Sequence, residues 1–114
     1  MNYKREVYEV LKDIGVPTNL RGYHYMLEMT EGFLTNRYSR DDNFTKIYKS
    51  VGEVFNCTYT SVERDIRHTI ENVLEYADKE VLKKYFGGLI NNRHKVTNTE
   101  FVLGIVEYIK MYRE

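Results

Sequence analysis

Two arginines, Arg64 and Arg67, stand three positions apart in a segment whose apolar residues recur at helical spacing. Residues three and four apart share one face of a helix, so both guanidinium groups would project to the same side. An arginine on such a face can bind the O6 and N7 atoms of guanine, and the neighbouring Glu63 can accept a hydrogen bond from cytosine N4. The spacing therefore predicts a helix that reads base edges in the major groove of DNA.

The segment before these arginines has the features of a helix-turn-helix. Gly52 is the small residue that the first helix needs where the second approaches closely. Asn56 tolerates the left-handed backbone conformation of a tight turn. Either Thr58 or Thr60 can cap the second helix, and Thr60 with Glu63 matches a capping box. The start of the second helix is therefore defined to within about two residues.

Apolar residues are expected to hold the two helices of this motif together. They are Val51, Phe55, Cys57, Val62 and Ile66. At about 100° per residue, the apolar positions of the second helix fall within an arc of roughly 80°, which marks its core side. These positions are Val62, Ile66, Ile70 and Val73. The outward side carries the candidate DNA-contacting residues, which are Thr60, Ser61, Arg64, Arg67 and His68, with Glu63 at the flank.

The same residues have a plainer interpretation. Glu63 and Arg67 form an i,i+4 pair in the favourable orientation, which supports a helix by about 0.2–0.5 kcal/mol without any DNA. Surface arginines are common on helices, and helix-turn-helix patterns also arise by chance in helical proteins. From the pattern alone, DNA reading and simple helix support therefore both stay open.

The rest of the chain is helical in pattern, and no stretch alternates with the period of a β-strand. Six helices are expected, at residues 3–14, 21–35, 44–55, 59–76, 79–85 and from the capping box at 97–100 to about 112. Gly15 and Pro17 end the first helix, and Gly87-Gly88 ends the fifth. The fold class is therefore all-α, with residues 1–114 forming one domain that contains a helix-turn-helix over 44–55 and 59–76.

Composition narrows the functional classes. Basic and acidic residues balance at 17 each, which argues against a protein that coats phosphates without sequence preference. A sequence reader whose few basic groups share one face is still compatible with this balance. No apolar run is long enough for a membrane span, and the N-terminal residues lack a signal-peptide core. The single cysteine, Cys57, cannot form an internal disulfide, which fits a cytoplasmic protein.

Other polar residues do not form a catalytic or metal-binding pattern. His24, His68 and His94 lie far apart and lack the spacing of zinc ligands. Cys57 is expected to be a buried structural thiol, because no histidine and acid can be assigned to activate it. We therefore expect no metal, no cofactor and no enzymatic activity.

A polar stretch at residues 91–95 precedes the last helix. In the simplest interpretation it is a solvated connector. In the alternative it is a wing in which Arg93 and Lys95 contact phosphates, which sets affinity but not sequence preference. We include Lys95 among the candidate DNA-contacting residues.

Several short motifs occur along the chain in an order known from one protein family. They are Asp13-Ile14-Gly15-Val16-Pro17, then Gly22-Tyr23 with Tyr25 and Leu27, Phe55-Asn56 with Thr58, Val62-Glu63-Arg64 with Ile66-Arg67-His68 and Ile70-Glu71, Phe86-Gly87, and Lys95 with Thr97-Asn98 and Glu100-Phe101. Taken together, they resemble the C-terminal DNA-binding effector domain of the sporulation master response regulator, stage-zero sporulation protein A, of endospore-forming bacteria. The resemblance runs from about residue 5 to residue 112.

The resemblance implies a six-helix domain that binds short TGTCGAA-like boxes in double-stranded DNA, often as tandem copies. A homodimer on tandem boxes and a contact with the sigma subunit of RNA polymerase are the implied partners. By their positions in the motif, Glu63 and Arg64 would read bases. Arg67 and His68 would support base or phosphate contacts.

Three positions depart from the family pattern. Ser61 stands where the family carries an arginine, so one guanine contact is expected to be lost. Asp65 stands where the family has a small residue, and it brings a negative charge near the DNA. Val96 replaces the proline that normally precedes Thr-Asn in the last loop. The preferred DNA box is therefore expected to differ from that of the family.

The chain begins at the effector domain, without the receiver domain and its phosphorylated aspartate that precede it in the family. A natural short relative and an excised domain both fit this beginning, and the untagged start Met1-Asn2-Tyr3-Lys4 favours the first.

Two functional hypotheses follow from the sequence. In the first, the protein is a sequence-specific transcription regulator that binds double-stranded DNA. In the second, it is a protein-interaction module that keeps the helix-turn-helix as a scaffold and modulates the full-length regulator or RNA polymerase without specific DNA binding.

Overall fold

The computed structural model describes residues 1–90 and 95–114. In chain order its helices are α1 (Tyr3–Ile14), α2 (Arg21–Leu34), α3 (Phe44–Phe55), α4 (Tyr59–Tyr76), α5 (Lys79–Phe86) and α6 (Asn98–Tyr112), with a short 3-10 turn, η1 (Gly87–Leu89), after α5. The described ranges contain no strand, and the expected all-α class with six helices is confirmed. None of the helices in these ranges is both long and apolar enough to cross a membrane.

The helix boundaries follow from local capping chemistry. Five helices begin after a side chain that accepts a backbone N–H of the first turn: Asn2, Asn43, Thr58, Asp78 and Thr97. Thr97 and Glu100 complete the capping box that the sequence indicated. Gly15 ends α1 in the left-handed conformation at φ 89°.

Two boundaries differ from the expected ones. α2 ends at Leu34, one residue early, and α5 extends one residue further, to Phe86. Gly87, at φ 57°, ends the α-helix as expected. The backbone then continues as the 3-10 turn η1 instead of leaving the helix axis at once.

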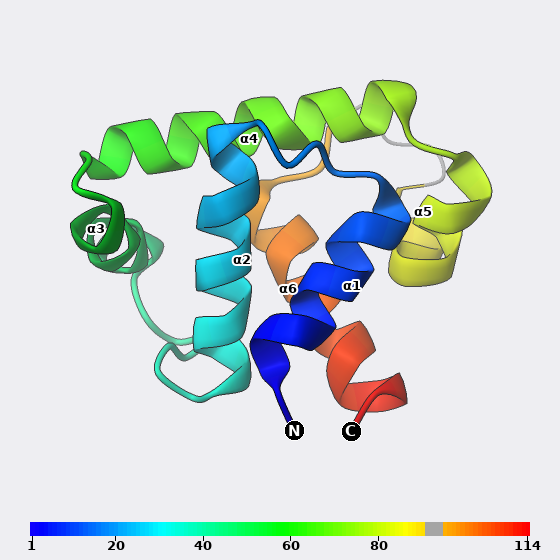
Figure 1. The fold of residues 1–114 in the computed structure, drawn as a ribbon, viewed down its shortest axis with the longest axis horizontal. Coiled ribbons are helices and arrows are strands. Elements are labelled where there is room, and N and C mark those ends of the chain that lie inside the picture. Colours follow the sequence, from blue (N-terminus) through cyan, green and yellow to red (C-terminus); the bar gives the residue numbers. More distant parts are fainter. Residues whose placement is uncertain (91–94) are drawn as a thin grey trace.

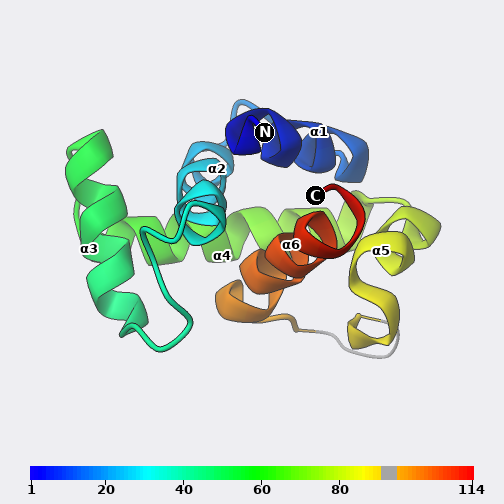
Figure 2. The ribbon, with the colours of Figure 1, turned by 90° about the horizontal axis from the view of Figure 1, so that it is seen from below.

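α4 runs along one side of the molecule, and the other helices pack beneath it (Figure 1). α2, α3 and α6 contact α4 directly. In the view from below, α3 and α5 lie at opposite ends, with α1, α2 and α6 between them (Figure 2). One side of α4 is therefore covered by the fold, and the other side faces solvent.

One hydrophobic core joins all six helices. Each helix contributes at least one buried side chain, for example Leu11, Met26, Val51, Ile66, Leu82 and Phe101. Burying a large aliphatic or aromatic side chain stabilises a fold by about 1.5–3 kcal/mol. The core is therefore what holds α4 in a fixed position.

The start of α2 approaches α4 so closely that only glycine fits. A Cβ at Gly22 would lie 2.1 Å from Thr69 Oγ1 and 2.3 Å from the backbone oxygen of Asp65. The Thr69 hydroxyl donates to that same Asp65 oxygen at 2.8 Å. The atoms that a Cβ would meet are therefore themselves held in place.

The two ends of the chain meet on the side away from α4 (Figure 1). The Tyr3 hydroxyl donates to Glu114 Oε1 at 2.6 Å. Arg113 Nη1 pairs with Glu6 at 3.1 Å and with Glu9 at 3.0 Å. These contacts fasten the end of α6 to α1.

Replacing Gly22 with alanine is expected to lower the free energy of unfolding by about 1–3 kcal/mol, the usual effect of overpacking a close contact. A Cβ at Gly88, by contrast, would meet no atom within 4 Å. Gly88→Ala is therefore the matched control, with an expected change below about 0.5 kcal/mol. Urea unfolding followed by circular dichroism measures both variants. A Gly22→Ala protein as stable as the wild type would contradict the close approach of α2 to α4.

Candidate nucleic-acid interface

The turn between α3 and α4 has the geometry of a helix-turn-helix. Asn56 ends α3 in the left-handed conformation, with φ 55° and ψ 51°, as the sequence indicated. The backbone N–H of Cys57 donates to the Gly52 oxygen at 2.8 Å. A Cβ at Gly52 would lie 2.5 Å from the Cys57 oxygen. Gly52 is thus the small residue that lets the turn fold directly back onto α3.

Thr58 is the residue that caps α4. Its Oγ1 accepts the backbone N–H of Ser61 at 3.2 Å, and the helix begins at Tyr59. The same oxygen lies 3.1 Å from Thr60 Oγ1 and donates to Ser61 Oγ at 2.9 Å. The helix start is therefore the earlier of the two that the sequence allowed, and a cluster of hydroxyl groups surrounds it.

The core side of α4 is the one expected from its periodicity. Val62, Ile66, Ile70 and Val73 are all buried. Val51 of α3 is buried with them in the same core.

Two residues of the turn differ from expectation. Phe55 is 39% exposed, and its ring packs edge-on against Tyr25 at a centroid distance of 5.2 Å. Cys57 is half-buried instead of fully buried. The reason is that the turn lies at the rim of the core, where α2 covers it from one side only.

Cys57 fastens the turn to α2. Its thiol donates to the Tyr25 hydroxyl at 3.4 Å. This contact and burial raise the pKa of Tyr25 to about 12, so the phenol stays neutral in neutral solution. The side chains of Cys57 and Tyr25 therefore fix the position of the turn from which α4 begins.

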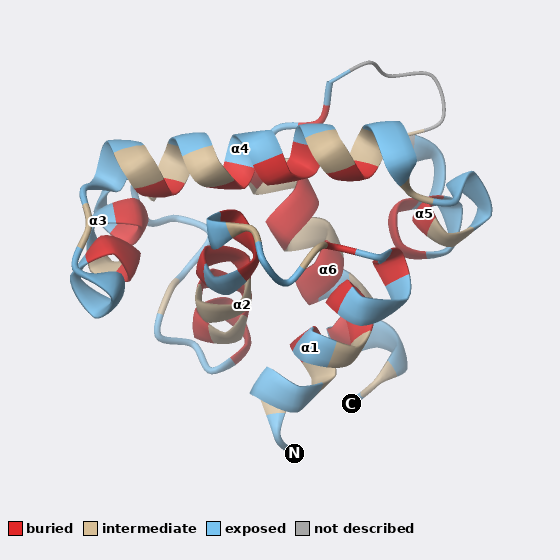
Figure 3. Cartoon of the chain, turned by 45° about the horizontal axis from the view of Figure 1, so that its top comes forward, coloured by how far each residue is buried: buried red, intermediate tan, exposed pale blue. Residues whose placement is uncertain are grey.

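The outward side of α4 is exposed to solvent (Figure 3). Its exposed members are Thr60, Arg64, Arg67 and His68, with Ser61 and Glu63 partly buried at the flanks. The fold thus brings the candidate residues of α4 onto one continuous surface, which we call the α4 face. Their contact with DNA stays a prediction.

Both arginines of the α4 face are paired with acids of the same helix. Arg67 Nε donates to Glu63 Oε1 at 3.1 Å, which raises the pKa of Arg67. Arg64 Nε lies 3.5 Å from Asp65 Oδ1, a pair that the sequence did not suggest. Both arginine side chains are still 51% exposed. Each guanidinium therefore keeps donors that a ligand can reach.

Asn98, which sequence reasoning missed, supports α4 from α6. Its buried Nδ2 donates to the Tyr48 hydroxyl at 3.2 Å and to the Glu63 backbone oxygen at 3.1 Å. Burial raises the pKa of Tyr48, and the Asn98 amide partly opposes that shift. Asn98 thus joins α3, α4 and α6 beneath the α4 face. The sequence signal for this role was an amide side chain directly after the N-cap Thr97 and before the apolar residues of α6.

Lys95 lies in the segment that leads into α6. It is exposed, and it precedes the N-cap of α6 by two residues. The hydrogen bond of Asn98 to Glu63 brings this end of α6 alongside α4. Arg93, the other residue of the wing interpretation, lies outside the described residues.

The opposite flank of α4 meets the start of α2 at a cavity of about 220 Å³. Its lining residues are Leu20, Arg21, Gly22, Asp65, His68 and Thr69. Leu20, the N-cap of α2, provides no side-chain hydrogen bond to the helix. The positive end of the α2 dipole is therefore directed at the flank that carries Asp65.

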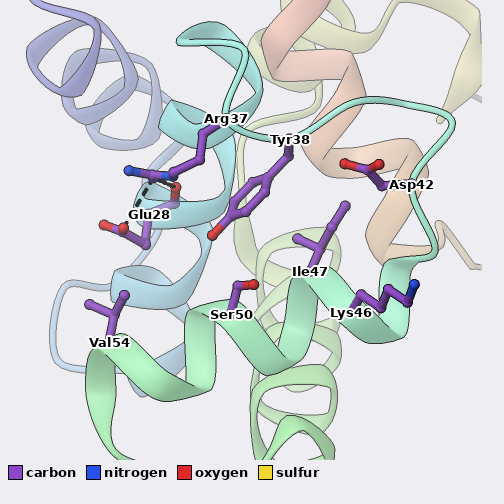
Figure 4. A pocket seen from close by; sticks show the side chains of 8 residues that line it. All are labelled: Glu28, Arg37, Tyr38, Asp42, Lys46, Ile47, Ser50 and Val54. Atoms are coloured by element: carbon purple, nitrogen blue, oxygen red, sulfur yellow. Dashed lines mark hydrogen bonds and ion pairs between the residues drawn. The ribbon is translucent and has the colours of Figure 1, made fainter.

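A larger cavity of about 430 Å³ lies between α2, α3 and the segment that joins them (Figure 4). Its lining residues are Glu28, Arg37, Tyr38, Asp42, Lys46, Ile47, Ser50 and Val54. Arg37 is already paired with Glu28 at 3.1 Å and with Glu31 at 3.7 Å. The cavity shares no lining residue with α4, so it is separate from the α4 face.

The described ranges contain no group of three or more His, Cys, Asp or Glu side chains that could hold a metal ion. The chemistry that the α4 face offers is hydrogen bonding by hydroxyl, guanidinium and carboxylate groups. Those are the groups with which proteins recognise base edges and phosphates.

A family model described as Sporulation initiation factor Spo0A C terminal matches residues 7–109 of the chain. The match covers nearly the whole sequence and includes α3, the turn and all of α4.

Replacing Asn98 with alanine is expected to lower the free energy of unfolding by about 1–3 kcal/mol, because the buried Tyr48 hydroxyl loses its partner. Tyr48→Phe should cost less, about 0.5–1.5 kcal/mol, since Asn98 keeps its bond to Glu63. The double variant should lose less than the sum of the two single changes. Thermal unfolding of the four proteins tests this coupling, and strict additivity would mean that the two side chains do not interact.

Proposed function

We propose, because the chain belongs to the Spo0A C-terminal family, that it reads a TGTCGAA-like box in double-stranded DNA through the α4 face. The family consists of DNA-binding effector domains of sporulation regulators, and regulation of transcription is therefore its general role. The observation that carries the finer proposal is the joint exposure of Arg64, Arg67 and His68 on a helix whose other side is buried.

Arg64 is the main base-reading residue in this proposal. It lies in the middle of the outward side of α4, and its side chain is 51% exposed. A guanidinium presents donors in a fork that matches guanine O6 and N7. Glu63 and Arg67 act together in this proposal. The Glu63 carboxylate that would accept a hydrogen bond from cytosine N4 also accepts one from Arg67 Nε.

The presence of Ser61 indicates that the preferred DNA box differs from that of the family. Its hydroxyl accepts from Thr58 within the cluster at the start of α4. A short side chain engaged in this way does not replace the reach of an arginine. One base pair of the family box is therefore expected to be read weakly.

Phosphate contacts complete the proposed interface. Two residues of the α4 face are proposed to contact the DNA backbone on either side of the groove. They are Thr60, at the exposed start of α4, and His68, further along the same side. Lys95, exposed just before α6, contacts phosphate in this proposal. Such contacts set affinity and orientation without adding sequence preference.

The resemblance also implies partners. We propose a homodimer on tandem boxes and a contact with the sigma subunit of RNA polymerase, in the cytoplasm, without a cofactor and away from membranes. The α4 face would be occupied by DNA, so the contact with the sigma subunit would use other surfaces of the domain.

A second candidate function is a protein-interaction module that modulates the full-length regulator or RNA polymerase without specific DNA binding. The observation that favours it is the pairing of both arginines with acids, Arg64 with Asp65 and Arg67 with Glu63. This pairing lowers the net positive charge of the α4 face. DNA titration separates the two functions.

The proposed function is tested by titrating the protein with a TGTCGAA-like duplex and with a scrambled duplex, each at two salt concentrations. Tighter binding to the box and a steep loss of affinity with salt are expected, since several phosphates are neutralised. Equal affinity for both duplexes would reject sequence reading and leave the interaction module as the remaining candidate.

Replacing Arg64 with alanine is expected to weaken binding to the preferred duplex by about 1–3 kcal/mol while leaving the scrambled duplex less affected. Helix content should not change, because the side chain is exposed. Fluorescence anisotropy with labelled duplexes measures the affinities. Loss of the fold in this variant would show that Arg64 is structural.

Replacing Lys95 with alanine should weaken binding to both duplexes alike and reduce the salt slope by about 1. Lys110→Ala is the matched control, because Lys110 is also exposed but lies in the last turn of α6, near the chain ends. A change in sequence preference on loss of Lys95 would contradict a pure phosphate contact.

A further inference from the structure

Asp65 lies on α4 between the α4 face and the start of α2. Its side chain is only 18% exposed. Its Oδ1 faces Arg64 Nε at 3.5 Å, while its Oδ2 is buried and has no hydrogen-bond partner in the described part of the chain. This carboxylate is therefore directed at one arginine of the α4 face.

The surroundings hold Asp65 in place. Its backbone oxygen accepts the Thr69 hydroxyl at 2.8 Å and lies against Gly22, where even a Cβ would not fit. Asp65 also lines the cavity at the start of α2, whose N-cap Leu20 gives no side-chain cap. The positive end of the α2 dipole favours a negative charge there, which offsets part of the cost of burying Oδ2.

We infer that Asp65 is a positioning residue that holds the guanidinium of Arg64 by its Nε edge and presents the two Nη groups to a base. The inference rests on the proposed function, because the held arginine matters only if Arg64 reads DNA. A long side chain that is ordered before binding loses less freedom when it binds. This smaller loss of side-chain entropy corresponds to an affinity about threefold to tenfold higher for the duplex that Arg64 recognises.

Asp65 also acts on DNA through its charge. A carboxylate beside the interface repels phosphates, so it lowers the affinity for every duplex. Positioning of Arg64, in contrast, favours only the preferred duplex. The two effects together raise the ratio of specific to nonspecific affinity, so Asp65 favours discrimination over tight binding.

Asp65→Asn tests this role, because it removes the charge and keeps the size. The probes are the duplex that the wild type selects from a random-sequence pool and a scrambled duplex of equal length. The variant should bind the scrambled duplex more tightly than the wild type does. The ratio of its affinity for the selected duplex to its affinity for the scrambled duplex should fall by about threefold to tenfold. An equal rise for both duplexes, with an unchanged ratio, would overturn the inference and leave Asp65 as a repelling charge.

Glu71→Gln is the matched control. Glu71 is exposed on the outward side of the same helix, where its charge acts on Arg67 through space without forming an ion pair within the described ranges. Removing its charge should raise both affinities with an unchanged ratio. A ratio that fell as far as in Asp65→Asn would also count against the inference, since any acid on the helix would then suffice.

A second measurement does not depend on DNA. In the free protein, the Arg64 Nε–H should exchange with water more slowly than that of Arg21, which is exposed and unpaired in the described residues. In Asp65→Asn and Asp65→Ala this protection should disappear, as followed by nitrogen-15 NMR. Equal exchange rates at Arg64 and Arg21 in the wild type would overturn the inference.

The two measurements separate failure of the inference from failure of the proposed function. If the wild type selects no duplex, sequence reading fails and the positioning role falls with it, whether or not Arg64 Nε–H is protected. If it selects a duplex but the ratio is unchanged in Asp65→Asn, only the positioning role fails. Asp65→Ala, the smaller side chain, repeats the ratio measurement if the asparagine variant folds poorly.

Discussion

The close approach of α2 to α4 at Gly22 orients every side chain of the α4 face. α4 is 18 residues long and lies at one side of the fold, and a turn of about 100° about its axis would exchange neighbouring positions. Contact with Thr69 and the Asp65 oxygen prevents such a turn from one flank. On the other flank, Asn98 prevents it through its hydrogen bond to the Glu63 backbone. The exposed arginines depend on these two contacts, although neither contact is itself exposed.

The α4 face carries acidic as well as basic residues, unlike the mainly basic surface of a protein that coats phosphates. Acidic and basic residues balance at 17 each in the whole chain, and the same balance recurs locally. Each arginine of the face has a carboxylate neighbour on its own helix. The net charge of the α4 face is therefore small, and both of its arginines already have an acidic partner in the free protein.

Local features of this fold could be predicted from the sequence, because local chemistry determines them. The capping box at Thr97, the left-handed Asn56 and the apolar period of α4 each depend on residues within a few positions of one another. The contacts that were missed join distant residues: Asn98 reaches Tyr48 of α3 and the backbone of α4. The exposure of Phe55 and the half-burial of Cys57 were missed for a related reason, since periodicity does not show where the core ends. Asp65 was expected to bring a negative charge near the DNA, and its pairing with Arg64 was missed because it depends on a rotamer that no spacing rule specifies.

The meeting of the two chain ends has a practical geometric consequence. Tyr3 and Glu114 are hydrogen-bonded to each other, on the side of the molecule away from α4. Any segment, tag or neighbouring domain joined at either end would therefore leave from the same place. That place lies on the side of the molecule away from α4 (Figure 1), so either terminus offers a point for anchoring, labelling or linking the domain that is remote from α4.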